Sequence, residues 1–138
     1  MIFRIDPLSS QPVFEQLAWQ VKQAIARGEL VAGDKLPSVR DIATEVRVNP
    51  NTVVRALDQL ERDRVIVRRQ GAGCFITPPS HDLSSQARHE QLDGLLEKVV
   101  TEAFHLGFQP DAIRAALDAA LLRIRFDDSK HSPRKGDS

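Results

Sequence analysis

Apolar residues recur every three or four positions along much of the first 63 residues, which is the spacing of amphipathic helices. The first helix is expected from Pro12, which suits a first helical position, to Gly28, which suits the left-handed position after a helix. Before this helix, Phe3 and Ile5 alternate with a polar residue and predict a short strand. The stretch 29–37, rich in turn residues, separates the first helix from the next one.

Two short helices then follow in close succession. Ser38, with Asp41 three residues later, is a helix start signal close to a capping box, and the apolar pattern of this helix ends at Val46. Asn49 can cap the next helix, which we expect to end near Asp63. Two short helices joined so tightly must cross steeply, as they do in a helix-turn-helix.

A β-hairpin is predicted directly after these helices. The β-branched run 65–67 and the segment 74–77 read as strands, and the glycine-bearing segment 69–73 joins them. Helices followed by a hairpin are the order of a winged helix. Residues 1–78 are therefore expected to form a winged helix-turn-helix domain.

The remainder of the chain predicts a smaller helical region, which makes the whole fold α+β. Prolines 78 and 79 end the hairpin, and residues 79–126 are expected to be a linker and an α-helical hairpin. Helical periodicity runs from about Arg88 to Gly107 and again from Pro110 to Ile124. Two helices cover only one face of each other, so a second copy of the chain could bury the rest. The tail 127–138 lacks this pattern and is expected to be disordered.

Composition changes this picture little. The 138 residues are 41% hydrophobic and 28% charged, and no apolar run approaches the ~18 residues that span a bilayer. The N-terminus does not resemble a signal peptide, and with one cysteine no internal disulfide can form, so we expect a cytoplasmic protein without a membrane partner. The net charge is zero, although residues 1–78 carry eleven basic against nine acidic residues. Any anionic partner must therefore be recognised by particular residues.

The second helix of the predicted helix-turn-helix carries side chains that suit DNA bases. Its inner side is defined by four apolar residues, Val53, Ala56, Leu57 and Leu60. This places Asn51, Arg55 and Arg62 on the outside, with Thr52 and Gln59 beside them. Asn and Arg can make paired hydrogen bonds to adenine and guanine, and Thr can touch a base edge. A solvated helix face is the plain alternative, but the neighbouring helix and hairpin favour DNA.

Other residues of this region affect contact with phosphates. Arg40 lies in the first turn of the preceding helix, where a phosphate contact is expected. The hairpin tip places Arg69 and Gln70, next to Arg68, beside the flexible backbone of Gly71, so these side chains could follow phosphates or enter the minor groove. The second helix of the helix-turn-helix is the recognition helix, which would enter the DNA groove. Three acidic residues lie nearer its C-terminal end, Asp58, Glu61 and Asp63. They would repel phosphates, so DNA contact is expected through the N-terminal half of that helix.

Several segments of the chain resemble the DNA-binding domain of the GntR family of bacterial transcription regulators. The segments are Gly33–Arg40, Val48–Val53 and Arg69–Ile76, with Arg55-Ala56-Leu57 between them. The chain departs from the family pattern at Arg47, where many relatives have a smaller residue, and at Cys74, where Thr is commoner.

The C-terminal region resembles the YtrA-like branch of that family through Leu106-Gly107-Phe108 and the following Pro110. The resemblance implies a homodimer that binds a palindromic operator, frequently beside transporter genes, and we expect the protein to act as a repressor. It also implies that five positions lie at the DNA: Arg40, Asn51, Thr52, Arg55 and Gly71.

Other functions were weighed on the same residues. A winged helix used as a protein-docking module is the alternative from another class, because the fold does not fix its use. No nucleophile and base pair, phosphate-binding glycine loop or metal-ligand spacing occurs, so we expect no enzymatic activity, cofactor or metal. The histidines are scattered, and Asp127-Asp128 with His131 is too small a group for a metal. A small-molecule effector would need a site between subunits or between domains.

Two single residues suggest more specific hypotheses. Trp19 lies opposite the apolar stripe of the first helix, so it could contact the C-terminal hairpin or a dimer mate rather than simply being exposed. Cys74 lies beside the DNA-facing turn, where oxidation could weaken binding, although a free cysteine is more often a small packed residue.

Overall fold

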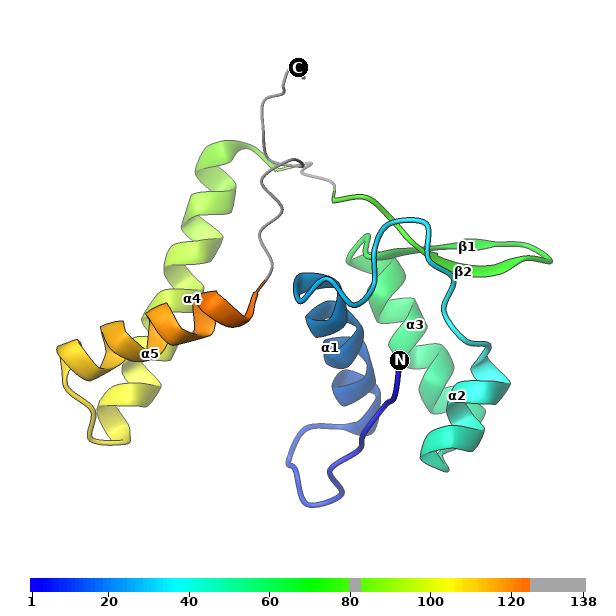
Figure 1. Cartoon of the computed structure of the whole chain (residues 1–138), viewed down its shortest axis with the longest axis horizontal. Helices are drawn as coiled ribbons and strands as arrows, with labels where there is room; N and C mark the ends of the chain where they lie inside the picture. The colour runs from blue at the N-terminus through cyan, green and yellow to red at the C-terminus, as the bar shows by residue number, and fades with distance from the viewer. Residues whose placement is uncertain (80–82, 125–138) are drawn as a thin grey trace. The chain divides into compact units, whose positions relative to one another are not determined.

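The chain folds into two units in the computed structural model, which describes residues 1–79 and 83–124. The N-terminal unit ends at Pro79, and the second lies within Ser80–Ile124. The N-terminal unit contains α1 (Val13–Ala26), α2 (Val39–Val46), α3 (Pro50–Arg62), β1 (Ile66–Arg69) and β2 (Gly73–Ile76) (Figure 1). The second contains α4 (Ser85–His105) and α5 (Pro110–Arg123). The predicted α+β class is confirmed, and the segment 127–138, expected to be disordered, lies outside the described residues.

The core of the N-terminal unit lies where α1 and α2 pack against α3. Leu60 and Val53 are the largest fully buried side chains, and Ile66 and Ile76 close the core from the hairpin. Burial of these apolar side chains supplies the main favourable term in folding. The core thereby fixes the outward face of α3.

The strand predicted at Phe3 and Ile5 is wrong. Phe3 is buried in the core, which explains its place in the alternating pattern, but no strand in residues 1–79 and 83–124 pairs with this segment. Its main chain bonds to side chains instead: the amide of Phe3 donates to Glu45 Oε2 at 2.7 Å, and the amide of Arg4 donates to Gln20 Oε1 at 2.9 Å. Side chains thus satisfy the main-chain groups that a strand would have paired.

The helix ends follow the predicted capping residues closely. Ser38 Oγ accepts the amide of Asp41 at 3.0 Å, and Asn49 Oδ1 accepts the amide of Asn51 at 2.8 Å. Pro12 precedes α1 as its cap rather than serving as its first residue. The helix expected from about Arg88 begins earlier, at Ser85. The apolar pattern did not reveal this first turn because its residues are polar.

The two strands form the predicted antiparallel hairpin, from Ile66 opposite Ile76 to Arg69 opposite Gly73. The stretch 29–37, expected as turns, adds a short third edge, since Lys35 forms an antiparallel bridge with Phe75. The amide of Leu36 also donates to the carbonyl oxygen of Cys74 at 2.9 Å. The β-hairpin, which is the wing of the winged helix, is therefore hydrogen-bonded to the segment that leads into α2.

The second unit consists of two helices joined by a short turn, and none of its residues from 83 to 124 is buried in a single chain. Large apolar side chains of both helices are exposed in a single chain, among them Leu95 of α4 and Leu122 of α5. Within residues 1–79 and 83–124, no helix is long and apolar enough to cross a membrane.

Candidate nucleic-acid interface

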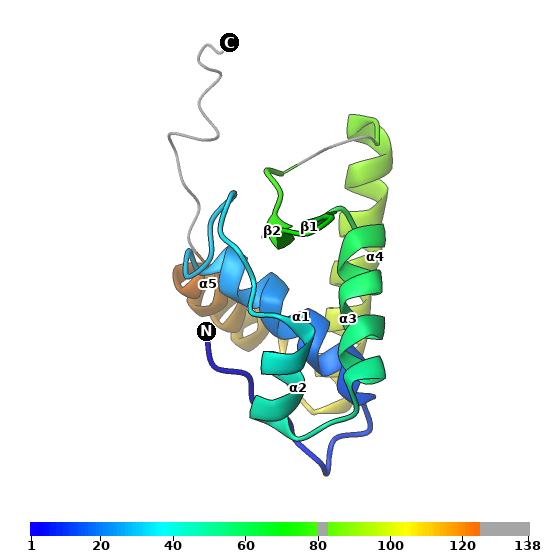
Figure 2. The same ribbon diagram turned by 90° about the vertical axis from the view of Figure 1, so that its right-hand side faces the viewer.

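The N-terminal half of α3 presents its polar side chains to solvent. Asn51 and Arg55 are exposed and Thr52 is half-buried, while Val53 and Leu60 face the core. Figure 1 shows α2 and the tip of the β-hairpin on the side of the N-terminal unit away from α1, and Figure 2 views the unit from that side. The helix-turn-helix and the wing thus share one face.

Arg40 projects from the first turn of α2, close to the N-terminal end of that helix. The side chain is exposed and forms no ion pair with any residue that the structure describes. The N-terminus of a helix carries partial positive charge, which adds to the attraction of the guanidinium for an anion. The expected phosphate contact therefore has an accessible cation in a favourable place.

Arg55 lies at the edge of the outward face rather than at its centre. Its guanidinium carbon lies 4.1 Å from the centroid of the Phe14 ring, which belongs to the start of α1. A cation over an aromatic face at this distance is attracted to it. Arg55 remains exposed, but its guanidinium is held by α1, which the helical pattern of α3 alone did not indicate.

The hairpin tip is exposed at Arg69, Gln70 and Gly71. The guanidinium carbon of Arg69 lies 5.2 Å from the centroid of the Phe75 ring. Gly71 has a φ of +77°, a conformation that glycine adopts without strain, and a Cβ added there would meet nothing within 4 Å. The tip is therefore a tight turn that leaves its backbone open to a partner.

Lys35 is a basic residue of the wing that sequence reasoning missed. A Cβ added at Gly73, where φ is +115°, would lie 2.8 Å from Lys35 Cε, so the lysine side chain lies across that glycine. The signal available in the sequence was the change from charged Lys35 to apolar Leu36, and in the structure Lys35 is exposed and Leu36 is buried. Lys35 therefore adds a cation to the hairpin near Arg69, which pairs with Gly73.

Arg68, grouped from sequence with the tip cations, contacts α3 instead. Its Nη2 donates to Asp58 Oδ1 at 2.7 Å, and its Nε lies 3.7 Å from Glu61 Oε1. The structure thus differs from the expected grouping with the tip, because Arg68 is engaged by two carboxylates of α3. The cause is the packing of β1 beside α3, which brings residues ten positions apart into contact.

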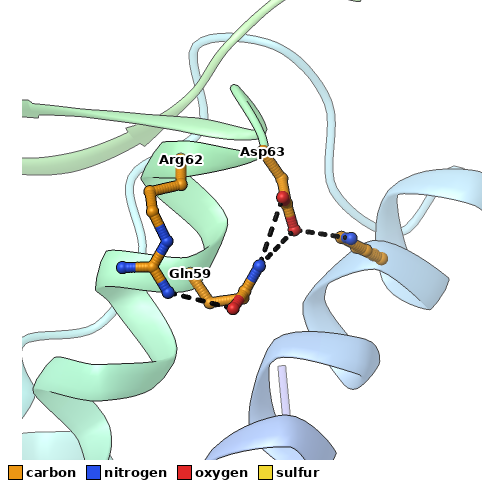
Figure 3. A network of polar contacts seen from close by, with 4 residues as sticks. Gln59, Arg62 and Asp63 are labelled. Atoms are coloured by element: carbon orange, nitrogen blue, oxygen red, sulfur yellow. Dashed lines mark hydrogen bonds and ion pairs between the residues drawn. The ribbon is translucent and has the colours of Figure 1, made fainter.

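A polar network holds the C-terminal end of α3 to α1 (Figure 3). Lys22 Nζ donates to Asp63 Oδ2 at 2.8 Å, Gln59 donates to the same carboxylate at 3.1 Å, and Arg62 donates to Gln59 Oε1 at 3.0 Å. Partial burial raises the pKa of Asp63, but the contacts with Lys22 and Gln59 and the charge of Arg62 outweigh this and lower the pKa below its usual 3.8. Arg62, predicted to read the groove, thus takes part in an intramolecular contact.

Comparison with known proteins agrees with this geometry. Residues 14–76 match the pattern of the family described as bacterial regulatory proteins, gntR family. Over 108 residues the chain is 34% identical to the HTH-type transcriptional repressor YtrA of Bacillus subtilis, an overlap that covers 78% of this chain and 83% of that protein. The chain belongs to the GntR family.

Solved structures extend the likeness of this GntR-family protein to its second unit. A transcriptional antiterminator from Listeria monocytogenes EGD-e is 31% identical, with a TM-score of 0.78 over 92% of this chain and 96% of that one. YtrA from Sulfolobus acidocaldarius, a GntR-family transcription factor, is 31% identical, with a TM-score of 0.60 over 73% of this chain and 99% of that one. The resemblance to the YtrA-like branch is thereby confirmed.

Membership of the GntR family decides between the classes of function left open by the sequence. The protein is a DNA-binding transcription regulator and not an enzyme, as expected. The docking-module alternative has no comparable support. In the part of the chain that the structure describes, no group of three side chains could hold a metal ion, and Asp127, Asp128 and His131 lie outside that part.

The two single-residue hypotheses stay predictions. Trp19 is 54% exposed on α1, as its position opposite the apolar stripe indicated, and its contact with a partner is untested. Cys74 is a half-buried free thiol in β2, opposite Arg68 in the hairpin, and its oxidation is likewise untested.

Proposed function

We propose that this GntR-family protein is a repressor that binds an inverted-repeat operator as a homodimer. Residues 1–78 form its DNA-binding domain, and the two helices within 79–126 form its dimerisation region. The residues that contact DNA are Arg40, Asn51, Thr52, Arg55, Arg69, Gln70 and Gly71. The observation that carries the proposal is the shared face on which the N-terminal half of α3, the start of α2 and the hairpin tip are exposed.

On this face the residues divide into two roles. Asn51, Thr52 and Arg55 lie on a helix that fits the major groove, so they read base edges and decide sequence preference. Arg40 and Arg69 contact phosphates, and Gln70 and Gly71 bring the wing close to the neighbouring minor groove. Binding therefore weakens steeply as salt increases, because the arginines displace counterions from DNA.

The dimer is supported by the apolar surface of the second unit. Neither α4 nor α5 has a buried residue, although Leu95 is 64% and Phe104 is 70% exposed in a single chain. Exposed apolar surface of this kind is unfavourable in water, and the same surface on a second copy of the chain could cover it. Two-fold symmetry of the pair then requires an inverted repeat in the operator.

The repressor assignment follows the similarity to YtrA of Bacillus subtilis, which is named a transcriptional repressor. We extend the proposal to transporter genes as targets and to the cytoplasm as the compartment where the protein meets DNA. Repression is tested by measuring reporter expression from a promoter that contains an operator selected from random DNA, with and without the protein. Higher expression when the protein is present would contradict repression.

The deciding experiment selects bound sequences from a random DNA pool with the full chain. We expect an inverted repeat, and Asn51→Ala should then lose about 1–3 kcal/mol on the selected operator and much less on random DNA. Arg40→Ala should instead weaken both DNAs and reduce the salt slope by about 1. Equal losses on both DNAs for Asn51→Ala would contradict its role in reading bases.

A separate variant tests the dimer. Leu95→Glu places a charge on the exposed side of α4, so we expect monomers in analytical ultracentrifugation and loss of operator binding. Glu97→Gln is the matched control, because it changes a neighbouring charge outside the apolar stripe. Monomeric parent protein at micromolar concentration would contradict the proposal.

A further inference from the structure

One arginine of the wing spans about two turns of the recognition helix. Arg68 Nη2 lies 2.7 Å from Asp58 Oδ1 and 3.5 Å from the main-chain oxygen of Val54, and Arg68 Nε lies 3.7 Å from Glu61 Oε1. Val54, Asp58 and Glu61 are spaced by four and then three residues, so they lie along one side of α3. A single guanidinium therefore ties the hairpin to this side of the helix.

The contact has an electrostatic consequence for DNA binding. The side chains of Asp58 and Glu61 are 41% and 44% exposed, so their charges act on anything that approaches α3. With Arg68 the three groups carry a net charge of −1, and without it they carry −2. Phosphates beside α3 would be repelled more strongly in the second case.

The contact also lies at the point where the hairpin leaves the surface of α3. The root of β1 is held by buried Ile66 and by the amide of Val65, which donates to the carbonyl oxygen of Leu60 at 2.9 Å. Among the residues that the structure describes, none in 69–73 makes a hydrogen bond or ion pair with α3. Arg68 is thus the last polar attachment of the wing to α3 before the tip.

We propose that Arg68 is a positioning residue for DNA binding, which holds the wing against α3 and neutralises Asp58 and Glu61 so that they do not repel phosphates. The inference rests on the proposed contact of α3 and the hairpin tip with DNA. It differs from that proposal in assigning Arg68 an effect through the two carboxylates rather than a contact of its own.

The test compares full-length variants on an operator selected from a random pool, by fluorescence anisotropy at fixed salt. Arg68→Ala should weaken binding about 5- to 10-fold, the order expected when surface charge near phosphates is no longer compensated. Asp58→Asn with Glu61→Gln should change the affinity of the parent less than about twofold, because the weaker repulsion of phosphates is offset by loss of the contact through which Arg68 holds the hairpin. The same two changes added to Arg68→Ala should recover most of the loss.

This recovery separates positioning from direct contact. If Arg68 bound a phosphate itself, the two neutralising changes would alter affinity equally with Arg68 present or absent, and that additivity would overturn the inference. An unchanged affinity of Arg68→Ala would overturn it as well. Arg68→Lys should fall between parent and alanine variant, because an ammonium cannot bridge both carboxylates as a guanidinium does.

Two controls keep the result interpretable. Thermal unfolding reports whether Arg68→Ala is folded, and if it is not, the neutralising pair must recover the loss in Arg68→Lys instead. Asn51→Ala reports on the proposed function: if it leaves operator binding intact, the DNA-facing role of α3 fails. If Asn51→Ala weakens binding while Arg68→Ala does not, only the present inference fails.

Discussion

Replacing Arg47 with glycine should raise the free energy of unfolding. Arg47 follows α2 in the left-handed conformation, with φ 59° and ψ 51°, and its amide donates to the carbonyl oxygen of Ala43. This conformation costs a residue with a Cβ about 1–2 kcal/mol, while glycine loses about 0.5–1 kcal/mol more backbone entropy on folding. Arg47→Gly should therefore raise the free energy of unfolding by the difference, about 0.5–1 kcal/mol.

The assay is urea and thermal unfolding of the full chain at one protein concentration, since a dimer's stability depends on concentration. For a unit of this size the gain corresponds to a rise in Tm of about 2–8 °C. Arg47→Ala removes the same side chain but keeps the strain, so it should not stabilise. Arg27→Gly, at a helix end with φ −86°, should destabilise. Equal stabilisation by Arg47→Gly and Arg47→Ala would refute the reasoning, because the cause would then be the arginine side chain.

Three further predictions concern the support of the recognition helix. Leu60→Ala removes a side chain with 0% exposure and should lower the free energy of unfolding by about 2–5 kcal/mol in urea titrations; a loss below about 1 kcal/mol would contradict its central place in the core. Asp63 has a lowered pKa in the folded state, so its ionised form stabilises the fold at neutral pH, and this contribution is lost as pH falls through 3.8 and then through the folded pKa. Asp63→Asn should therefore destabilise at pH 7 and match the parent at the acidic end of a pH series, whereas a constant difference would count against the network. Phe14→Leu and Arg55→Met should show a coupling of about 0.5–1 kcal/mol in a double-mutant cycle of unfolding free energies, and strictly additive effects would show that the cation–π contact contributes nothing.

The helices and the hairpin could be predicted from the sequence because their signals are local. Ser38 and Asn49 cap helices through amides three and two residues away, and the apolar stripe of α3 is a property of its own periodicity. The exposed positions of Arg40 and Asn51 follow from the same patterns. Their role at DNA stays a proposal, since exposure alone does not identify a ligand.

The sequence by itself therefore determined which segments become helices and strands and which sides of them are apolar, because these depend on backbone geometry over a few residues. Only the tertiary structure decided which charged side chains are engaged inside the protein. Arg68 meets Asp58 across 10 positions, and Lys22 meets Asp63 across 41. Such contacts depend on the angle and distance at which whole elements pack, and these are set by the shapes of the buried side chains rather than by spacing along the chain.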